Sequence, residues 1–216
     1  FHVVTYSAKK NADVYAENII QAAAGMSFTL HAAGSSQSVN LAFLGEHNIG
    51  NALAAAACCM AVGSSFENII SGLQAAKPYE GRLQSKCGVN DCLVIDDSYN
   101  ANPASVRMAI DALMACDGNK ILVLGDMGEL GANARELHAD IGAYAKEAGV
   151  ENFLVTGALS RYAAESFGAS AKKFDNWQLL ADYCLSQAEE NSVFLIKGSR
   201  SAGMDRVADV LVEAGR

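Results

Sequence analysis

The chain has 216 residues, of which 51% are hydrophobic, 19% are charged and only two are proline, a composition that excludes a disordered or low-complexity polymer. Its 24 acidic and 16 basic side chains give a net charge of −8, which argues against nonspecific binding to nucleic acid or to an anionic membrane. The sequence has no apolar run of about 18 residues and no recognisable signal peptide, so we expect a cytoplasmic protein that binds small molecules and does not insert into membranes. Six cysteines without a CxxC pair predict reduced, structural thiols and no metal site.

The first part of the chain predicts a small β-region followed by two helices. The Ala-rich segment 48–62 is apolar on all sides, as a buried helix is, and 65–76 predicts a second helix capped by Ser64 or Ser65. Because the chain opens within a strand pattern, we expect that an N-terminal portion precedes it in the whole protein. Short apolar or alternating runs, parted by Gly and Ser turns, predict strands over residues 1–6, 16–21, 26–33 and 39–44.

A break at Lys77-Pro78-Tyr79-Glu80-Gly81 predicts a domain boundary, with one domain over residues 1–78 and another over 79–216. Beyond it, apolar strands covered on both faces alternate with helices, which predicts an α/β domain with a mostly parallel, doubly wound, Rossmann-like sheet. In such sheets ligands bind at the carboxyl ends of the strands. The expected strands are 82–86, 92–96, 120–124, 152–156, 172–174 and 193–196, and the expected helices are 103–116, 134–148, 159–167, 177–189 and 204–214.

The first strand-end loop of this domain, 96–103, is rich in polar side chains. It carries two carboxylates, a hydroxyl, a phenol and two amides ahead of a helix with Asn102 as the expected N-cap and Pro103 as its first residue. An elaborate helix cap is one interpretation. Since a cap needs only one such side chain, we favour a ligand site, in which adjacent carboxylates accept from ribose hydroxyls or hold a cation.

The next loop, 125–131, matches GxxGxxG but lacks the G-x-G with which a dinucleotide fingerprint begins. Asp126 and Glu129 would also repel a phosphate. The loop suits an amine-bearing substrate better, with simple turn chemistry as the alternative.

The last strand-end loop, 197–203, places Lys197 and Arg200 among small residues before a helix. Such a loop binds a carboxylate or a phosphate through charge, backbone amides and the helix N-terminus, and a solvated basic turn is the alternative.

In the first domain, Asn48 and Asn51 share one face of the Ala-rich helix, where two amides could contact an adenine edge or simply cap the helix. On sequence alone, Arg82 is a strand-edge arginine.

Four motifs in this order resemble those of the Mur ligase family, which makes the bacterial peptidoglycan precursor by ATP-dependent amide formation. They are Gly45–Asn51, Tyr79–Arg82, Asp96–Pro103 and Lys197–Arg200. The resemblance implies the C-terminal part of the family's central ATP-binding domain over 1–78 and its C-terminal domain over 79–216. For the whole protein, the stretches 97–103, 123–131 and 197–201 imply addition of D-Ala-D-Ala to UDP-MurNAc-tripeptide through an acyl phosphate, with ATP and Mg²⁺, by a monomer.

Carried over residue by residue, the resemblance implies three groups of contacts. The ATP contacts would be Asn48, Asn51, Arg82 and Asp97. The cleft where nucleotide and dipeptide meet would be lined by Ser98, Tyr99, Asn100 and Asn102. The peptide end or its carboxylates would be held by Lys197, Ser199 and Arg200.

One departure from the family is an absence. The phosphate loop G-x-x-G-K-[ST], the central-domain magnesium ligands and the carbamoylated lysine of the family are not found in this sequence, and in the family all of them precede the segment that matches residue 1. We therefore expect a C-terminal portion of a ligase that is inactive alone, and assign no catalytic residue and no metal ligand. The alternatives are a sibling Mur or folylpolyglutamate-type ligase, or a non-catalytic α/β module that binds a nucleotide or peptide.

Overall fold

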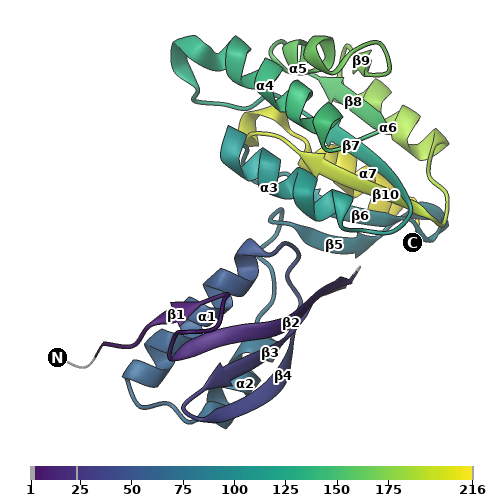
Figure 1. The fold of residues 1–216 in the computed structure, drawn as a ribbon. Coiled ribbons are helices and arrows are strands. Elements are labelled where there is room, and N and C mark those ends of the chain that lie inside the picture. The colour runs from purple at the N-terminus through teal and green to yellow at the C-terminus, as the bar shows by residue number, and fades with distance from the viewer. Residues whose placement is uncertain (1–2, 23, 216) are drawn as a thin grey trace. The chain divides into compact units, whose positions relative to one another are not determined.

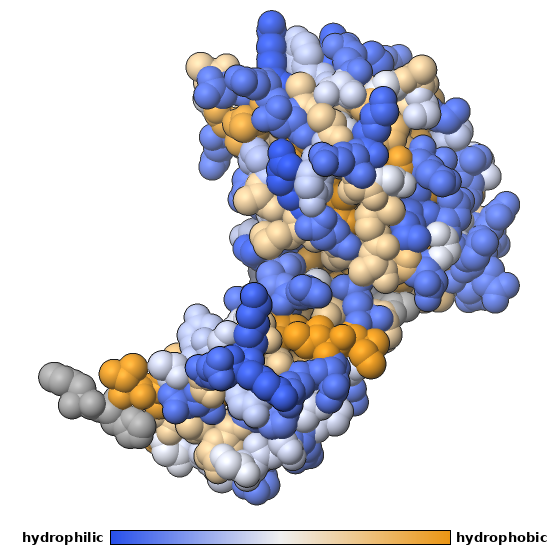
Figure 2. All heavy atoms as spheres, in the orientation of Figure 1, coloured by the Kyte–Doolittle hydropathy of each residue, from blue (hydrophilic) through white to orange (hydrophobic). Residues whose placement is uncertain are grey.

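The computed structural model describes residues 3–22 and 24–215, which form two compact units, one ending at Pro78 and the other beginning at Tyr79 (Figure 1). In both units hydrophilic side chains cover most of the face seen in Figure 2. None of the helices in the described part of the chain has the length and apolar character needed to cross a membrane.

The first unit is a four-stranded sheet with two helices. The strands follow the order β1-β2-β3-β4, with β1 parallel to β2 and the other pairs antiparallel. Alternate residues of β3, such as Phe28 and Leu30, are buried in a core shared with the helices. The elements are β1 (Tyr6–Ser7), β2 (Val14–Ala22), β3 (Gly25–Ala32), β4 (Ser35–Leu41), α1 (His47–Ala61) and α2 (Phe66–Ala75).

Two strands of this unit differ from the sequence expectation. Of the strand expected over 1–6, residues 1–2 lie outside the described residues, and the short strand β1 begins only at Tyr6. The strand expected from residue 39 begins at Ser35, because a polar stretch pairs with β3 at the edge of the sheet and carries no apolar signal. Ser65, one of the two expected caps, accepts a hydrogen bond from the Asn68 N–H at 3.3 Å.

The second unit is a six-stranded sheet of order β5-β6-β10-β7-β8-β9, with β5 antiparallel and the other pairs parallel. The expected mostly parallel, doubly wound sheet is confirmed. Its strands are β5 (Gln84–Cys87), β6 (Leu93–Asp97), β7 (Asn119–Leu124), β8 (Asn152–Thr156), β9 (Lys172–Phe174) and β10 (Ser192–Lys197). Its helices are α3 (Pro103–Met114), α4 (Ala134–Glu147), α5 (Ser160–Phe167), α6 (Trp177–Ser186) and α7 (Asp205–Glu213), with short 3-10 turns at Val89–Asp91, Gly131–Asn133 and Arg200–Ala202.

Helices cover both faces of this sheet, so the inner strands β6, β7, β8 and β10 are mostly apolar and buried, whereas the edge strands β5 and β9 are largely polar. One face packs on α6 and α7 through a core that includes Phe194 and Leu180. The alternate strand residues point the other way, where Phe153 meets Phe167 of α5 with ring centroids 5.1 Å apart. The central strand β10 is buried along its whole length.

The position of β10 determines where the sheet opens. Because β10 lies between β6 and β7, the chain leaves β6 toward α3 but leaves β10 toward α7, on the opposite face. Loops that diverge in this way leave a crevice at the carboxyl ends of the strands, which is where such sheets bind ligands.

The cysteines are all free, as the sequence predicts, but they are not all buried. Cys58, Cys59 and Cys87 are exposed. Burial raises the pKa of Cys92 to about 11 and the pKa of Cys184 to about 12, so both thiols stay protonated and act as small apolar side chains.

Candidate functional site

An open pocket of about 630 Å³ lies in the second unit at the carboxyl ends of β6, β7 and β10. This is the crevice that the strand order predicts. Polar and charged side chains form most of its lining: Tyr79, Glu80, Gly81, Asp96, Ser98, Tyr99, Asn100, Glu129, Arg200, Asp205 and Asp209.

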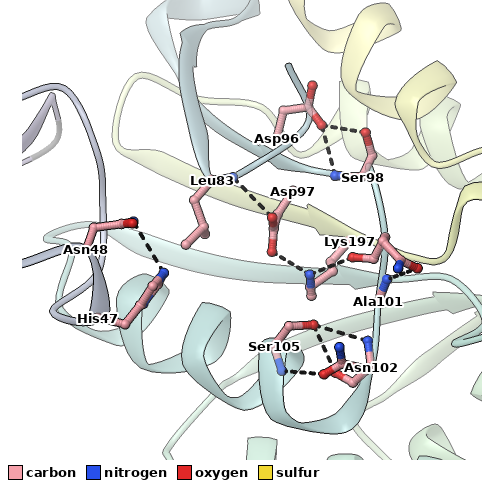
Figure 3. A network of polar contacts seen from close by, with 11 residues as sticks. His47, Asn48, Leu83, Asp96, Asp97, Ser98, Ala101, Asn102, Ser105 and Lys197 are labelled. Carbon is pink, nitrogen blue, oxygen red and sulfur yellow. Dashed lines mark hydrogen bonds and ion pairs between the residues drawn. The ribbon is translucent and has the colours of Figure 1, made fainter. Parts of the chain in front are cut away.

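A buried ion pair lies at the ends of β6 and β10 (Figure 3). The Lys197 Nζ donates to Asp97 Oδ2 at 2.5 Å and to the Asn100 carbonyl at 2.9 Å, and the Leu83 N–H donates to Asp97 Oδ1 at 3.1 Å. Burial raises the pKa of Asp97, although the Lys197 charge opposes this shift, and burial lowers the pKa of Lys197.

The sequence analysis expected Lys197 to hold a ligand carboxylate, and in the structure its ammonium group is paired with Asp97. Lys197 is only 1% exposed, so its ammonium group neutralises Asp97 and fastens the loop at Asn100 instead of facing a ligand. A lone charge at this depth would be costly, which explains why the two residues are paired.

Asp96 and Ser98 form a second buried set beside it. Asp96 Oδ1 accepts from the Ser98 hydroxyl at 2.6 Å and from the Ser98 N–H at 3.1 Å (Figure 3). Asp96 Oδ2 accepts from Lys86 Nζ at 2.7 Å. Ser98 therefore has a fixed position in the pocket wall, as the sequence analysis expected of a cleft residue.

The two asparagines of this loop have different surroundings. Asn102 caps α3: its Oδ1 accepts from the Ser105 N–H at 2.9 Å, and its own N–H donates to Ser105 Oγ at 3.1 Å. It does not line the pocket, whereas Asn100 does. The two interpretations of loop 96–103 therefore both hold, the cap for Asn102 and a pocket wall for Ser98 to Asn100.

Tyr99 contacts two arginines. The Arg82 Cζ lies 4.5 Å from the centroid of the Tyr99 ring, and the Arg200 Cζ lies 5.8 Å from it. Tyr79 meets the same ring edge-on at 5.7 Å. Arg200, expected from the sequence as an anion-binding residue, is exposed at the pocket wall, and Arg82 is exposed beside it.

Three acidic residues of the pocket were missed as ligand contacts by sequence reasoning: Glu80, Asp205 and Asp209. Burial raises the pKa of Asp209, Lys86 opposes the shift and the Asp96 and Asp205 charges add to it. The i, i+4 spacing of Asp205 and Asp209 after the Arg200 loop was a usable signal, because it puts both carboxylates on one side of α7. The pocket lining thus combines an arginine with several carboxylates.

Loop 125–131 contributes Glu129 to the pocket and little else. The Asp126 carboxylate accepts from the N–H groups of Ala158, Leu159 and Ser160 at 2.7–3.0 Å, and so caps the start of α5. This corrects the idea that Asp126 faces a substrate amine. The turn-chemistry alternative holds for Asp126, while Glu129 remains at the pocket.

Ser199 is also more structural than expected. It is 4% exposed, its N–H donates to the Asp126 carbonyl at 2.8 Å, and its hydroxyl lies 3.2 Å from the Ser201 hydroxyl. Ser199 is absent from the pocket lining, so its expected contact with a peptide end stays a prediction.

In the first unit, Asn48 and Asn51 lie together at the start of α1, as their spacing predicts. The Asn51 Nδ2 donates to Asn48 Oδ1 at 3.0 Å, and the Asn48 Nδ2 donates to the Leu44 carbonyl at 2.8 Å. Neither side chain accepts from the helix N-terminus in the manner of an N-cap. The two amides form one pair, which leaves the carbonyl oxygen of the exposed Asn51 as a further acceptor.

No group of three or more His, Cys, Asp and Glu side chains among residues 3–22 and 24–215 is arranged to hold a metal ion.

Comparisons with known proteins point to one family. Residues 81–200 match the model described as Mur ligase, glutamate ligase domain, and residues 1–59 match the Mur ligase middle domain. The UDP-N-acetylmuramoyl-tripeptide--D-alanyl-D-alanine ligase of Escherichia coli is 39% identical over 206 residues, which is 95% of this chain and 46% of that protein.

Solved structures agree with this. A crystal structure of MurF from Acinetobacter baumannii superimposes with a TM-score of 0.85 at 33% identity, over 97% of this chain and 46% of that one. MurF from Thermotoga maritima, solved in complex with ADP, shares the fold with a TM-score of 0.83 at 21% identity, over 98% of this chain and 48% of that one. The chain spans about half the length of the relatives it matches. It belongs to the Mur ligase family and, within that family, to the MurF group.

Proposed function

We propose that the chain is part of an ATP-dependent ligase that joins the amine of D-Ala-D-Ala to the terminal carboxylate of UDP-MurNAc-tripeptide. Residues 1–78 would be the C-terminal part of its central ATP-binding domain, and 79–216 its C-terminal domain. The ligase activity in the names of the relatives supports the proposal. The observation that carries it is the pocket of the second unit, in which Arg200 and several carboxylates line one cavity.

The charges of this pocket suit a zwitterion. A free dipeptide carries an ammonium group at one end and a carboxylate at the other, which match the carboxylates and Arg200 respectively. A nucleotide polyphosphate would instead meet Glu80, Glu129, Asp205 and Asp209, and like charges in a partly enclosed site repel. We therefore assign the dipeptide to this pocket, with its carboxylate at Arg200.

The nucleotide contacts remain a proposal that rests on the resemblance. Asn48 and Asn51 offer an amide acceptor in the first unit, and Arg82 offers a guanidinium in the second. Each Asp97 oxygen already accepts one hydrogen bond, which leaves a further lone pair on each for a ribose hydroxyl. Tyr99 and Asn100 stay in the proposed dipeptide site, whereas Asn102, Lys197 and Ser199 support the loops behind it.

In the proposed reaction the γ-phosphoryl group of ATP passes to the tripeptide carboxylate and ADP leaves. The dipeptide ammonium group then loses a proton to solvent, and the resulting amine displaces phosphate from the acyl phosphate to form the amide. The contribution of this chain is to hold the dipeptide by both charged ends, so that only its amine needs to move to the reacting carbon. Fixing a nucleophile in this way is worth several orders of magnitude in effective concentration.

The test is ligation by the full-length protein with a panel of amine substrates: D-Ala-D-Ala, L-Ala, D-Glu and a diamino acid. Mass spectrometry would identify the product on UDP-MurNAc-tripeptide and on its precursors. We expect product only with D-Ala-D-Ala and the tripeptide. A product with a single amino acid would indicate a sibling ligase, and no ATP-dependent product would favour a non-catalytic binding module.

A further inference from the structure

The aromatic ring of Tyr99 contacts two arginines that come from distant parts of the second unit. Arg82 precedes β5 and Arg200 follows β10, and their Cζ atoms lie 4.5 and 5.8 Å from the Tyr99 centroid. Only Arg200 lines the pocket. The ring therefore orients one cation that belongs to the pocket wall and one that lies outside it.

Within the described residues, neither guanidinium has a hydrogen bond or an ion pair. What fixes the two cations is the face of the ring, to which guanidinium groups are attracted. Both keep their N–H donors free for an anionic ligand.

The ring itself is firmly placed. The Tyr99 N–H donates to the Gly81 carbonyl at 2.9 Å, and a Cβ added to Gly81 would lie only 3.0 Å from the Tyr99 nitrogen. The preceding Ser98 is 5% exposed and is tied to Asp96. Tyr79 packs against the edge of the ring. An aromatic ring that is fixed by several contacts can hold the guanidinium groups that stack on it in place before a ligand binds.

We propose that Tyr99 is a positioning residue that holds Arg200 for the carboxylate of the dipeptide and Arg82 for the phosphates of the nucleotide. Tyr99 also lines the pocket, but its proposed part in binding is to act through the two arginines. The proposal rests on the function proposed above, and it gives one ring a part in both binding events.

The test is equilibrium binding of ADP and of D-Ala-D-Ala to the full-length protein, measured by calorimetry. Tyr99→Leu should weaken both affinities by about threefold to tenfold, because it removes the ring face. Tyr99→Phe keeps the face and should recover most of the loss. As a matched control, Tyr162→Leu removes a ring that lies 5.3 Å from the Arg135 Cζ, outside the pocket lining, and should change neither affinity.

Double variants separate action through the arginines from direct contact. In an Arg200→Ala background, Tyr99→Leu should no longer affect dipeptide binding but should still weaken ADP binding. In an Arg82→Ala background the pattern should reverse. Additive effects in both backgrounds would overturn the proposal, and so would a Tyr99→Phe variant as weak as Tyr99→Leu. Failure of the wild-type protein to bind either ligand would instead overturn the proposed function.

Discussion

Replacing Lys197 by methionine would leave the buried Asp97 carboxylate without its cation. At the 2.5 Å separation of Lys197 Nζ and Asp97 Oδ2, and with an effective dielectric constant of about 20, the attraction is about 7 kcal/mol. The variant no longer has to bury an ammonium group, and this saving in desolvation free energy offsets part of the lost attraction. We therefore expect Lys197→Met to lower the free energy of unfolding by about 3–5 kcal/mol, the cost found when one partner of a buried pair is removed.

The assay is urea unfolding followed by fluorescence of Trp177, the single tryptophan of the chain, which lies in α6 of the second unit. The double variant Asp97→Asn with Lys197→Met removes both charges and should be more stable than Lys197→Met alone. This double-mutant cycle isolates the coupling between the two side chains. The reasoning would be refuted if the losses of unfolding free energy of the two single variants simply added in the double variant. A loss below about 1 kcal/mol for Lys197→Met would refute it as well.

The loss of stability caused by Lys197→Met should also depend on pH. Lys197 opposes the burial that raises the pKa of Asp97, so this pKa rises further in Lys197→Met. A carboxyl whose folded pKa lies above its unfolded value contributes stability at low pH and loses it as pH rises through the folded pKa. Lys197→Met should therefore be closer to the wild type at pH 5 than at pH 8, and an equal cost at both values would contradict this cause.

Three further changes test the scaffold around the pocket. Gly142→Ala should lower stability by about 1–3 kcal/mol in urea unfolding, because its Cβ would lie 1.9 Å from the Ala163 carbonyl oxygen; an unchanged midpoint would argue against this tight helix contact. Asp126→Ala removes the acceptor of three N–H groups at the start of α5 and should cost about 2–3 kcal/mol, with faster amide exchange at residues 158–160; unaltered exchange there would count against the cap. Glu129 has a left-handed backbone with φ of 60°, so Glu129→Gly should raise the Tm by about 1–3 °C while weakening D-Ala-D-Ala binding; a lower Tm would contradict the strain argument.

The sequence predicts the second unit well where the apolar pattern is strong. The bounds of β8 and β9 are those expected, because each is a short run between clear breaks. The polar edge strand β4 is the counterexample, since its first residues are held by pairing with β3 and carry no hydrophobic signal. Helix ends were also less accurate, and α6 stops at Ser186 instead of residue 189.

The site was predictable in outline only. Strand order and loop chemistry indicate the crevice, and Ser98, Tyr99, Asn100 and Arg200 do line it. The ion pair of Lys197 could not be predicted because its partner, Asp97, lies 100 residues earlier, and no local pattern shows that a strand-end lysine turns inward. Asp205 and Asp209 share one side of α7, but Glu80 meets them only through the tertiary fold, so their common pocket became visible only in the structure.

The most direct test of the account is to measure how the full-length protein binds D-Ala-D-Ala, N-acetyl-D-Ala-D-Ala and D-Ala-D-Ala amide. If the pocket recognises both charged ends of the dipeptide, acetylation of the amine and amidation of the carboxylate should each weaken binding by about tenfold or more, since each removes one charge-assisted interaction. Equal affinity for all three ligands would contradict the assignment of a zwitterionic dipeptide to this pocket.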